Sequence, residues 1–399
     1  MTVQPMSHQA PTSDEVIERA EEIIPILQSN AAQSEALRYL APDSMAALKE
    51  AGVFRIMQSR QYGGYEMDLR TFQRVAAALV PGDPAAAWVF MVLAAHTWMM
   101  NMFPEEAGDE IAGSDPDVLI AGTLAPQGKA EPVEGGGFRL SGRWQFASGC
   151  DHATWILVGA TQTTSTREDP KHVHTLLPIS EGTIDDTWHV LGLRGTGSKD
   201  VLLDNVYVPP HRVVPTGTLF GGRSDGALRH PTSLYLMPLI TGLAFGLSGP
   251  VLGLARASLD AFVERNRLRE TMYVPGSKAR NVGIQLRVAE SAAEIRSAEL
   301  MLRDAADSFD ALAVERRPAD VDLRVRLKWQ IAYCIQICRR SVERIYAAAG
   351  AHSVYERSPL QTYFRDINVA THHATVDFDG AMEVYGRTAL GLDPGTPLV

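Results

Sequence analysis

Histidine side chains in apolar surroundings are the groups of this sequence best suited to acid–base chemistry. His96 stands in the run Ala-His-Thr-Trp of residues 95–98, within an otherwise apolar segment, and His372 and His373 are adjacent near the end of the chain. An imidazole changes charge near neutral pH, so each of these side chains could take up or release a proton during catalysis. A single histidine in an apolar helix is more often a hydrogen-bonded core residue, so the residue types alone leave both interpretations open.

Two other groups of residues have the right types but an unsuitable spacing. Asp151 and His152 resemble an acid–base pair, but adjacent side chains on an extended chain point apart, which favours a turn over a catalytic dyad. Cys334 and Cys338 share one face of a predicted helix, and together with Cys150 they lack the spacing of a zinc site. We interpret the cysteines as small core residues.

The glycine-rich segments do not have the spacing of a nucleotide site. No G-x-G-x-x-G follows a predicted strand, and no G-x-x-x-x-G-K-[ST] is present. Gly195-Thr196-Gly197 comes closest, but no third glycine and no helix start follow it. The sequence therefore shows no site for NAD(P)H.

The composition is that of an ordinary globular protein. The 399 residues are 45% hydrophobic and 21% charged, and the net charge of -10 is not gathered into blocks, which disfavours nucleic acid as a partner. The most apolar stretches, residues 85–100 and 234–254, contain Pro, His or many Gly and Ser, so we predict core helices and no membrane span. The N-terminus lacks the pattern of a signal peptide, and the three cysteines are interpreted as reduced thiols. Both observations indicate a cytoplasmic protein.

Three segments with different periodicity must position the candidate side chains. The first ~115 residues are predicted to be helical, beginning with a capping box at Thr12 and Glu15. Short β-branched and aromatic runs separated by turn residues come next and predict an antiparallel β-domain. Four long segments, at about 234–270, 280–315, 318–350 and 360–388, then predict a bundle. The predicted fold is α+β, with an N-terminal all-α domain (1–116), a central antiparallel β-domain (117–230) and a C-terminal four-helix bundle (231–399).

This domain order resembles that of the acyl-CoA dehydrogenase superfamily. Residues 191–198, Leu-Gly-Leu-Arg-Gly-Thr-Gly-Ser, followed by Val-Tyr-Val-Pro at 206–209, are similar to the second half of that family's β-domain. Residues 142–149, Gly-Arg-Trp-Gln-Phe-Ala-Ser-Gly, resemble the strand that carries flavin-contacting groups. The catalytic glutamate of the family's Y-E-G-T element has no counterpart in residues 365–375, where the two histidines stand instead.

This departure resembles the aromatic hydroxylase oxygenases of two-component flavin monooxygenases, among them 4-hydroxyphenylacetate 3-hydroxylase and steroid-ring phenol hydroxylase oxygenases. Residues 148–153 and 391–395, with the run at 191–198, carry the likeness. It implies an oxygenase that uses reduced flavin (FMNH2 or FADH2) and O2, through a C4a-hydroperoxyflavin, to hydroxylate a small phenol-, aniline- or indole-like compound. Without an NAD(P)H site, the chain would need a separate NAD(P)H:flavin reductase.

The resemblance also assigns catalytic roles to particular residues. Ser148 is expected beside flavin N5 and His373 near the hydroperoxide. His96 and Thr123 are expected against the substrate hydroxyl, where a near-neutral pKa would suit His96 to take the proton.

Further contacts are implied less directly. Trp98 could line the substrate site and Trp144 the flavin site, although aromatic residues at such spacings are more often residues of the hydrophobic core. Thr196 and Ser198 could contact the flavin from the β-domain. Members of the superfamily bind the flavin phosphate with an arginine of a neighbouring subunit in the stretch that follows Arg265, Arg267 and Arg269, and Arg269 is the candidate here, with a solvated helix face as the alternative. The flavin lies at a subunit contact in this superfamily, so the resemblance implies a homotetramer.

Three alternatives stay open at this point. An enzyme of the same branch could oxygenate nitrogen or sulfur. The chain could instead be an acyl-CoA dehydrogenase or flavin oxidase, or a non-catalytic binding protein on the same scaffold.

Overall fold

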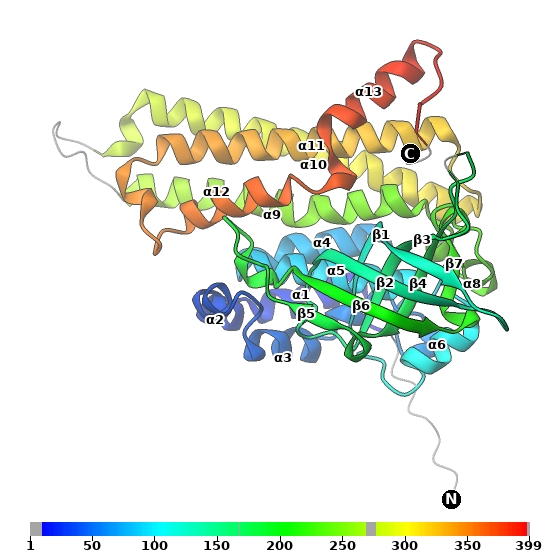
Figure 1. The fold of residues 1–399 in the computed structure, drawn as a ribbon. Helices are drawn as coiled ribbons and strands as arrows, with labels where there is room; N and C mark the ends of the chain where they lie inside the picture. Colours follow the sequence, from blue (N-terminus) through cyan, green and yellow to red (C-terminus); the bar gives the residue numbers. More distant parts are fainter. Residues whose placement is uncertain (1–9, 167, 269–276, 397–399) are drawn as a thin grey trace, which may run out of the picture.

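The N-terminal part of the chain forms a group of helices that lies beneath the long helices of the C-terminal part (Figure 1). The structure, a computed structural model, describes residues 10–166, 168–268 and 277–396. The predicted capping box is confirmed, because the Thr12 hydroxyl accepts from the Glu15 amide and the Glu15 carboxylate accepts from the Thr12 amide. The helices are α1 (Ser13–Glu22), α2 (Ile24–Leu37), α3 (Pro42–Glu50), α4 (Leu69–Leu79), α5 (Pro84–Met100) and α6 (Glu105–Ala112).

Helix α5 is buried along nearly its whole length, as expected from its continuous apolar sequence. Asp83 caps its first turn by accepting from the Ala85 amide at 2.8 Å, and Pro84 occupies the first helical position, where no amide is needed. The helix packs against α4, α9 and β1. Side chains on α5 are therefore held on several sides at once.

The central part is a seven-stranded sheet with the order β5-β6-β2-β1-β3-β4-β7. Strands β1 and β3 pair in parallel, whereas the other neighbouring strands are antiparallel, so the prediction of an entirely antiparallel domain is wrong at this pair. After β2, the chain crosses to the other edge of β1, and β3 then starts from the same end as β1. The strands are β1 (Ile120–Pro132), β2 (Phe138–Ala147), β3 (Trp155–Gln162), β4 (His172–Pro178), β5 (Thr183–Asp185), β6 (Lys199–Val208) and β7 (Val213–Pro215).

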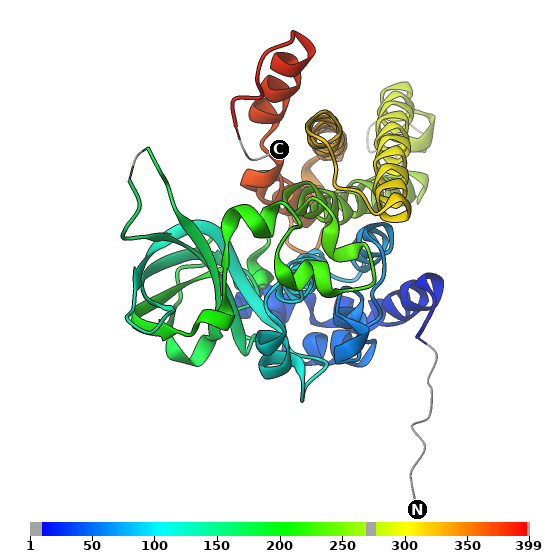
Figure 2. The same cartoon turned by 90° about the vertical axis from the view of Figure 1, so that its right-hand side faces the viewer.

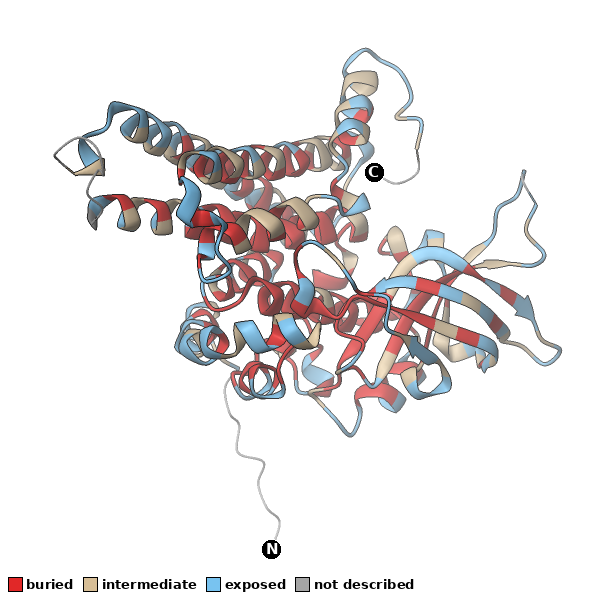
Figure 3. Ribbon diagram, turned by 60° about the vertical axis from the view of Figure 1, so that its left-hand side comes forward, coloured by how far each residue is buried: buried red, intermediate tan, exposed pale blue. Residues whose placement is uncertain are grey.

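Two short helices, α7 (Thr216–Phe220) and α8 (Asp225–Arg229), lead to the C-terminal helices. These are α9 (Leu239–Leu268), α10 (Val282–Glu315), α11 (Val321–Ala348), α12 (Pro359–Ala370) and α13 (Phe378–Ala389). The sheet lies to one side of the helices and α1 to the other (Figure 2), and the buried residues concentrate where the sheet and the two groups of helices meet (Figure 3).

The fourth segment of the predicted bundle is two helices and not one. Helix α12 ends at Ala370, and Asp377 caps a new helix, α13, by accepting from the Gly380 amide at 2.7 Å. Helix α13 rises away from the rest of the bundle (Figure 1), and its Tyr385 stacks on Trp329 of α11 with ring centroids 4.5 Å apart. The interruption places His373 in the link between α12 and α13, just before a 3-10 turn (Ala374–Val376), so its direction does not follow from α-helical periodicity.

Among the described residues, one helix is long and apolar enough to cross a bilayer. It is α9, and 89% of its most apolar window is buried within the protein. This burial agrees with the core helix predicted for residues 234–254.

Candidate active site

His96 lies on α5 with one ring nitrogen fixed by the sheet. Its Nδ1 is 3.0 Å from the carbonyl oxygen of Ile120, at the start of β1. A carbonyl oxygen only accepts, so Nδ1 carries the proton and Nε2 keeps a lone pair. Burial, with a smaller contribution from the nearby His373, lowers the pKa of His96 to about 4. The near-neutral pKa expected from the sequence is therefore wrong, and His96 is a neutral hydrogen-bond acceptor at pH 7.

Three buried hydroxyls from two separate loops form a hydrogen-bonded chain. Thr196 Oγ1 donates to the Leu193 carbonyl at 2.8 Å and lies 2.7 Å from Ser198 Oγ. Ser198 Oγ lies 2.7 Å from Ser148 Oγ, which follows the end of β2. Ser148 Oγ also accepts from Trp88 Nε1 of α5 at 3.2 Å. The structure thus brings together Ser148, Thr196 and Ser198, three of the predicted site residues.

The direction of this hydroxyl chain is fixed at its Thr196 end. The single hydroxyl proton of Thr196 is used on Leu193, so Ser198 must donate to Thr196, and Ser148 must in turn donate to Ser198. Ser148 consequently accepts from Trp88, donates to Ser198 and retains one lone pair. It presents an acceptor, and no donor, to a group that binds beside it.

His373 has the opposite hydrogen-bonding character to His96. The Thr375 amide donates to its Nδ1 at 3.3 Å, and the Thr375 hydroxyl lies 2.8 Å from the same nitrogen. An amide only donates, so the proton of neutral His373 is on Nε2. The ring is reachable by solvent in the single chain, yet desolvation by the surrounding protein lowers its pKa to about 4. At neutral pH His373 therefore offers an N–H donor.

Trp88 connects these groups and was not predicted as a site residue. Its indole N–H donates to Ser148, and its ring meets the His373 ring edge-on with centroids 6.0 Å apart. Trp88 precedes His96 by eight residues, which places the two within about 80° of each other around a helix. That spacing could have identified Trp88 from the sequence.

The structure places three of the predicted residues outside the group formed by His96, His373, Trp88 and the hydroxyl chain. Trp98 lies in the core, where its indole N–H donates to Leu234 at 3.1 Å, and Trp144 is buried within the sheet and donates to Gly159 at 2.6 Å. Thr123 donates to the Gln145 carbonyl at 3.0 Å. The preceding residue, Gly122, lies against the His96 ring, and successive residues of a strand face opposite sides, so Thr123 points away from His96. Arg269 lies outside the described residues.

Asp83, the N-cap of α5, is a buried carboxylate. Its Oδ2 has no hydrogen-bond partner among the described residues. Burial raises its pKa to about 7, with Asp366 as a further contribution. A carboxyl whose pKa is raised on folding stabilises the folded state most at low pH, and that stability is lost as pH rises through the folded pKa.

We expect Asp83→Asn to weaken this pH dependence while preserving the cap, because Asn caps helices as well as Asp does. Between pH 6 and pH 7 the free energy of unfolding of the wild type should fall by about 1 kcal/mol through this group alone, and that of the variant should fall by less. Urea unfolding at pH 6, 7 and 8, at one protein concentration, measures the difference. Parallel curves for the two proteins would show that Asp83 titrates normally.

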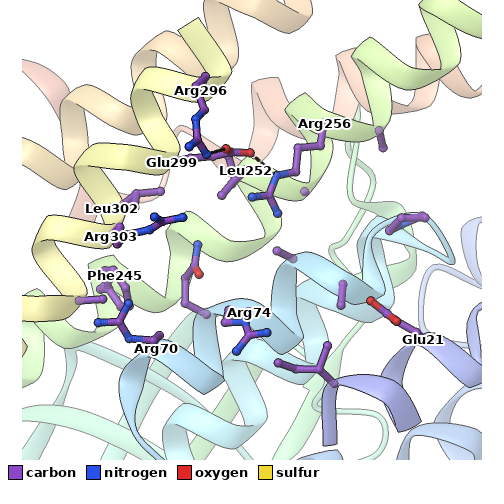
Figure 4. Close-up of a pocket in the computed structure, with 18 of the residues that line it drawn as sticks. Glu21, Arg70, Arg74, Phe245, Leu252, Arg256, Arg296, Glu299, Leu302 and Arg303 are labelled. Carbon is purple, nitrogen blue, oxygen red and sulfur yellow. Dashed lines mark hydrogen bonds and ion pairs between the residues drawn. The ribbon is translucent and has the colours of Figure 1, made fainter. Parts of the chain in front are cut away.

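A groove of about 870 Å³ lies elsewhere, between α1, α4, α9 and α10 (Figure 4). Its arginines are largely paired with acidic neighbours: Glu299 bonds both Arg256 (2.7 Å) and Arg296 (3.0 Å), and Arg70 bonds Asp310. None of the predicted site residues lines this groove. It is a charged surface feature separate from the hydroxyl chain and the two histidines.

Comparisons with known proteins agree with this fold. Residues 245–378 match the family described as "Acyl-CoA dehydrogenase, C-terminal domain". The chain is 34% identical over 388 residues to the FADH(2)-dependent resorcinol hydroxylase, oxygenase component, of Rhizobium sp., covering 95% of each chain. It is 32% identical to the flavin-dependent monooxygenase, oxygenase subunit HsaA, of Rhodococcus jostii, covering 94% of this chain and 98% of the relative.

A solved structure extends the likeness to three dimensions. XiaF from Streptomyces sp., in complex with FADH2 and glycerol, superposes with a TM-score of 0.90 at 28% identity, covering 96% of this chain and 97% of XiaF. The predicted acyl-CoA dehydrogenase-like fold is thereby confirmed. The chain belongs to the family of flavin-dependent monooxygenase oxygenase components built on that fold.

Proposed function

We propose that this protein is the oxygenase component of a two-component flavin monooxygenase that hydroxylates a small aromatic compound with reduced flavin and O2. The observation that carries the proposal is the fixed direction of the hydroxyl chain, which leaves Ser148 with a single free lone pair. Reduced flavin carries an N–H at N5, and an acceptor without a competing donor is the group that would hold that proton in place.

The residues around Ser148 fit a flat, partly apolar ring system. Phe146 has a φ of +69°, a conformation that is costly for an aromatic residue, and its ring is 63% exposed while it packs edge-on against Trp188. An exposed aromatic ring on strained backbone, two residues from a buried acceptor, favours a bound aromatic group at this place. When bound there, a reduced flavin would supply the electrons that activate O2.

The two histidines are assigned complementary tasks. His96 Nε2 would accept a hydrogen bond from the substrate hydroxyl or amine and draw its proton away as the ring is oxidised. His373 Nε2–H would donate to oxygen-derived groups on the other side of the site. Both tasks need neutral imidazoles, and the lowered pKa of each histidine keeps it neutral at pH 7.

Some of the remaining predicted contacts stay part of the proposal and others are left out. Thr196 and Ser198 act through Ser148, whereas Thr123 is left out, because its hydroxyl donates to Gln145 on the strand face away from His96. Trp98 and Trp144 are left out, since their indole N–H groups are satisfied inside the core and the sheet. Arg269 is retained for the flavin phosphate on sequence resemblance alone.

The proposal includes partners. An oxygenase component of this kind works with a separate reductase that supplies reduced flavin, as the names of the relatives imply for those proteins. We also propose a cytoplasmic homotetramer. Apolar side chains at one end of the bundle support a subunit contact, because Val282, Leu286 and Val354 are 65%, 58% and 64% exposed in the single chain. Light scattering should give the mass of four chains.

The direct test is single-turnover oxygenation. Purified protein is mixed anaerobically with reduced FMN or FADH2 and a phenol, aniline or indole, and ¹⁸O2 is then admitted. We expect one ¹⁸O atom in the product and the other in water. Release of hydrogen peroxide alone with every compound tested, combined with dye reduction by acyl-CoA, would establish dehydrogenase chemistry instead.

Replacing Trp88 by Phe should raise the hydrogen peroxide released per flavin oxidised by about three- to tenfold, the usual weight of one lost hydrogen bond to a buried group. The variant removes the N–H donated to Ser148 and keeps an aromatic ring beside His373. Trp98→Phe is the matched control, because Trp98 lies on the same helix, α5, and its indole N–H donates to the Leu234 carbonyl in the core. Equal peroxide release from both variants would remove Trp88 from the site.

A further inference from the structure

Asp366 is a buried carboxylate on α12 that bonds across to the loop before β6. Its Oδ1 accepts from the Leu193 amide at 2.6 Å, and the residue is 5% exposed. It does not belong to the hydroxyl chain and was not singled out by the sequence. Seven residues later, the same stretch of chain reaches His373.

Arg365 and Asp366 hold three consecutive loop residues between them. Arg365 Nη1 donates to the Leu191 carbonyl at 2.9 Å, while Asp366 accepts from Leu193. Gly192, between them, lies directly on α12: a Cβ at this position would be 2.4 Å from the Arg365 carbonyl oxygen. This two-point attachment, which we call the Arg365–Asp366 clamp, leaves the loop little freedom to shift along the helix.

Leu193 is the residue on which the hydroxyl chain ends. Its carbonyl accepts from the Thr196 hydroxyl at 2.8 Å and from Trp188 Nε1 at 3.1 Å. Its φ of +51° is strained for a leucine and persists only if the surroundings fix it. The Leu193 carbonyl sets the direction of every hydrogen bond back to Ser148, so a displaced Leu193 would disturb the lone pair that Ser148 presents.

The groups that face Asp366 come from four elements. They are Asp83 before α5, Glu35 of α2, Tyr363 and Arg365 of α12 itself and Arg194 of the loop. Burial raises the pKa of Asp366 to about 7. An Oδ1 acceptor remains available in the carboxylate, in the neutral acid and in an asparagine, so the hydrogen bond to Leu193, and not the charge, is the feature to test.

We propose that Asp366 is a positioning residue, which fixes Leu193 from α12 and thereby holds the hydroxyl chain and the His373 link in one geometry. The effect of Asp366 on flavin binding rests on the proposed function. The attachment of the loop at Leu193 to α12 does not depend on that function. Asp366 would act through Leu193, Thr196 and Ser198, without touching flavin or substrate.

Hydrogen–deuterium exchange of the flavin-free protein tests the attachment. In Asp366→Ala, the amide of Leu193 should exchange about tenfold faster or more, the weight of a lost hydrogen bond to a buried acidic group. Asp366→Asn should retain most of the protection, and Asn368→Ala, which removes a bond within α12 to Phe364, should leave Leu193 unchanged. Unchanged exchange in Asp366→Ala, or equal loss in the Asn variant, would overturn the proposal.

Turnover separates this role from general destabilisation. Once the wild type is shown to oxygenate a substrate, Asp366→Ala should release severalfold more hydrogen peroxide per flavin oxidised, with rescue by Asp366→Asn at the same temperature. If the Leu193 amide of Asp366→Ala exchanges faster but the variant releases no more hydrogen peroxide per flavin oxidised than the wild type, the positioning role is wrong while the proposed function stands. If the wild type oxygenates nothing, the proposed function fails and the exchange result still decides the attachment.

Discussion

Replacement of His96 by Asn should lower the rate of product formation by about 10²- to 10⁴-fold, the range for loss of a positioned general base. The Asn side chain can still donate to the Ile120 carbonyl, as His96 Nδ1 does, but it offers nothing at the position of Nε2. The variant thus removes the acceptor for the substrate proton while keeping the bond that holds the residue to β1. Reduced flavin should still be oxidised, with hydrogen peroxide as the main product.

The matched control for His96 is another buried histidine that bonds a backbone carbonyl. His230 is 4% exposed, its Nε2 lies 3.0 Å from the Asn101 carbonyl, and burial likewise lowers its pKa. His230→Asn should change the stability of the protein and leave the ratio of product to peroxide as in the wild type. Product formation by His96→Asn within tenfold of the wild type would mean that His96 is only a core residue.

Replacement of Ser148 by Ala should shift the fate of reduced flavin from product to hydrogen peroxide by about 10- to 100-fold. The substitution removes the acceptor proposed for the flavin N–H and leaves the Trp88 N–H without its acceptor, while Ser198 loses the hydroxyl that donates to it and still donates to Thr196. Oxygen consumption should continue, because the substitution affects the steps that come after activation of O2. The measurement is peroxide released and product formed per flavin oxidised, under single-turnover conditions.

Two further variants make this test specific to the hydroxyl chain. Thr196→Val keeps the shape of the side chain and frees Ser198 from its fixed direction, so it should release an intermediate amount of peroxide. Ser248→Ala is the control, since this serine is also buried and its hydroxyl donates to the Phe245 carbonyl within α9. If Ser148→Ala and Ser248→Ala give the same ratio of product to peroxide, the hydroxyl chain has no part in oxygenation.

The fold was predictable because its cues are local. Capping residues, helical and strand periodicity and short motifs such as the run at 191–198 each depend on residues near one another in sequence. The parallel pairing of β1 with β3 and the break between α12 and α13 were missed, because strand order and helix direction depend on contacts between distant segments. The same limit explains why Trp98, two residues from His96, was placed with the substrate: the sequence does not say which side of a fully apolar helix faces the site.

The sequence by itself determined the class of protein and named His96, Ser148, Thr196, Ser198 and His373, because these residues stand within motifs of a known family. Only the tertiary structure decided what each of them can do. Which nitrogen of His96 or His373 carries the proton depends on the backbone group that bonds the other nitrogen. The free lone pair of Ser148 depends on hydrogen bonds among α5, the turn after β2 and the loop before β6. A hydrogen-bond direction is a property of the partners, and folding alone brings those partners together.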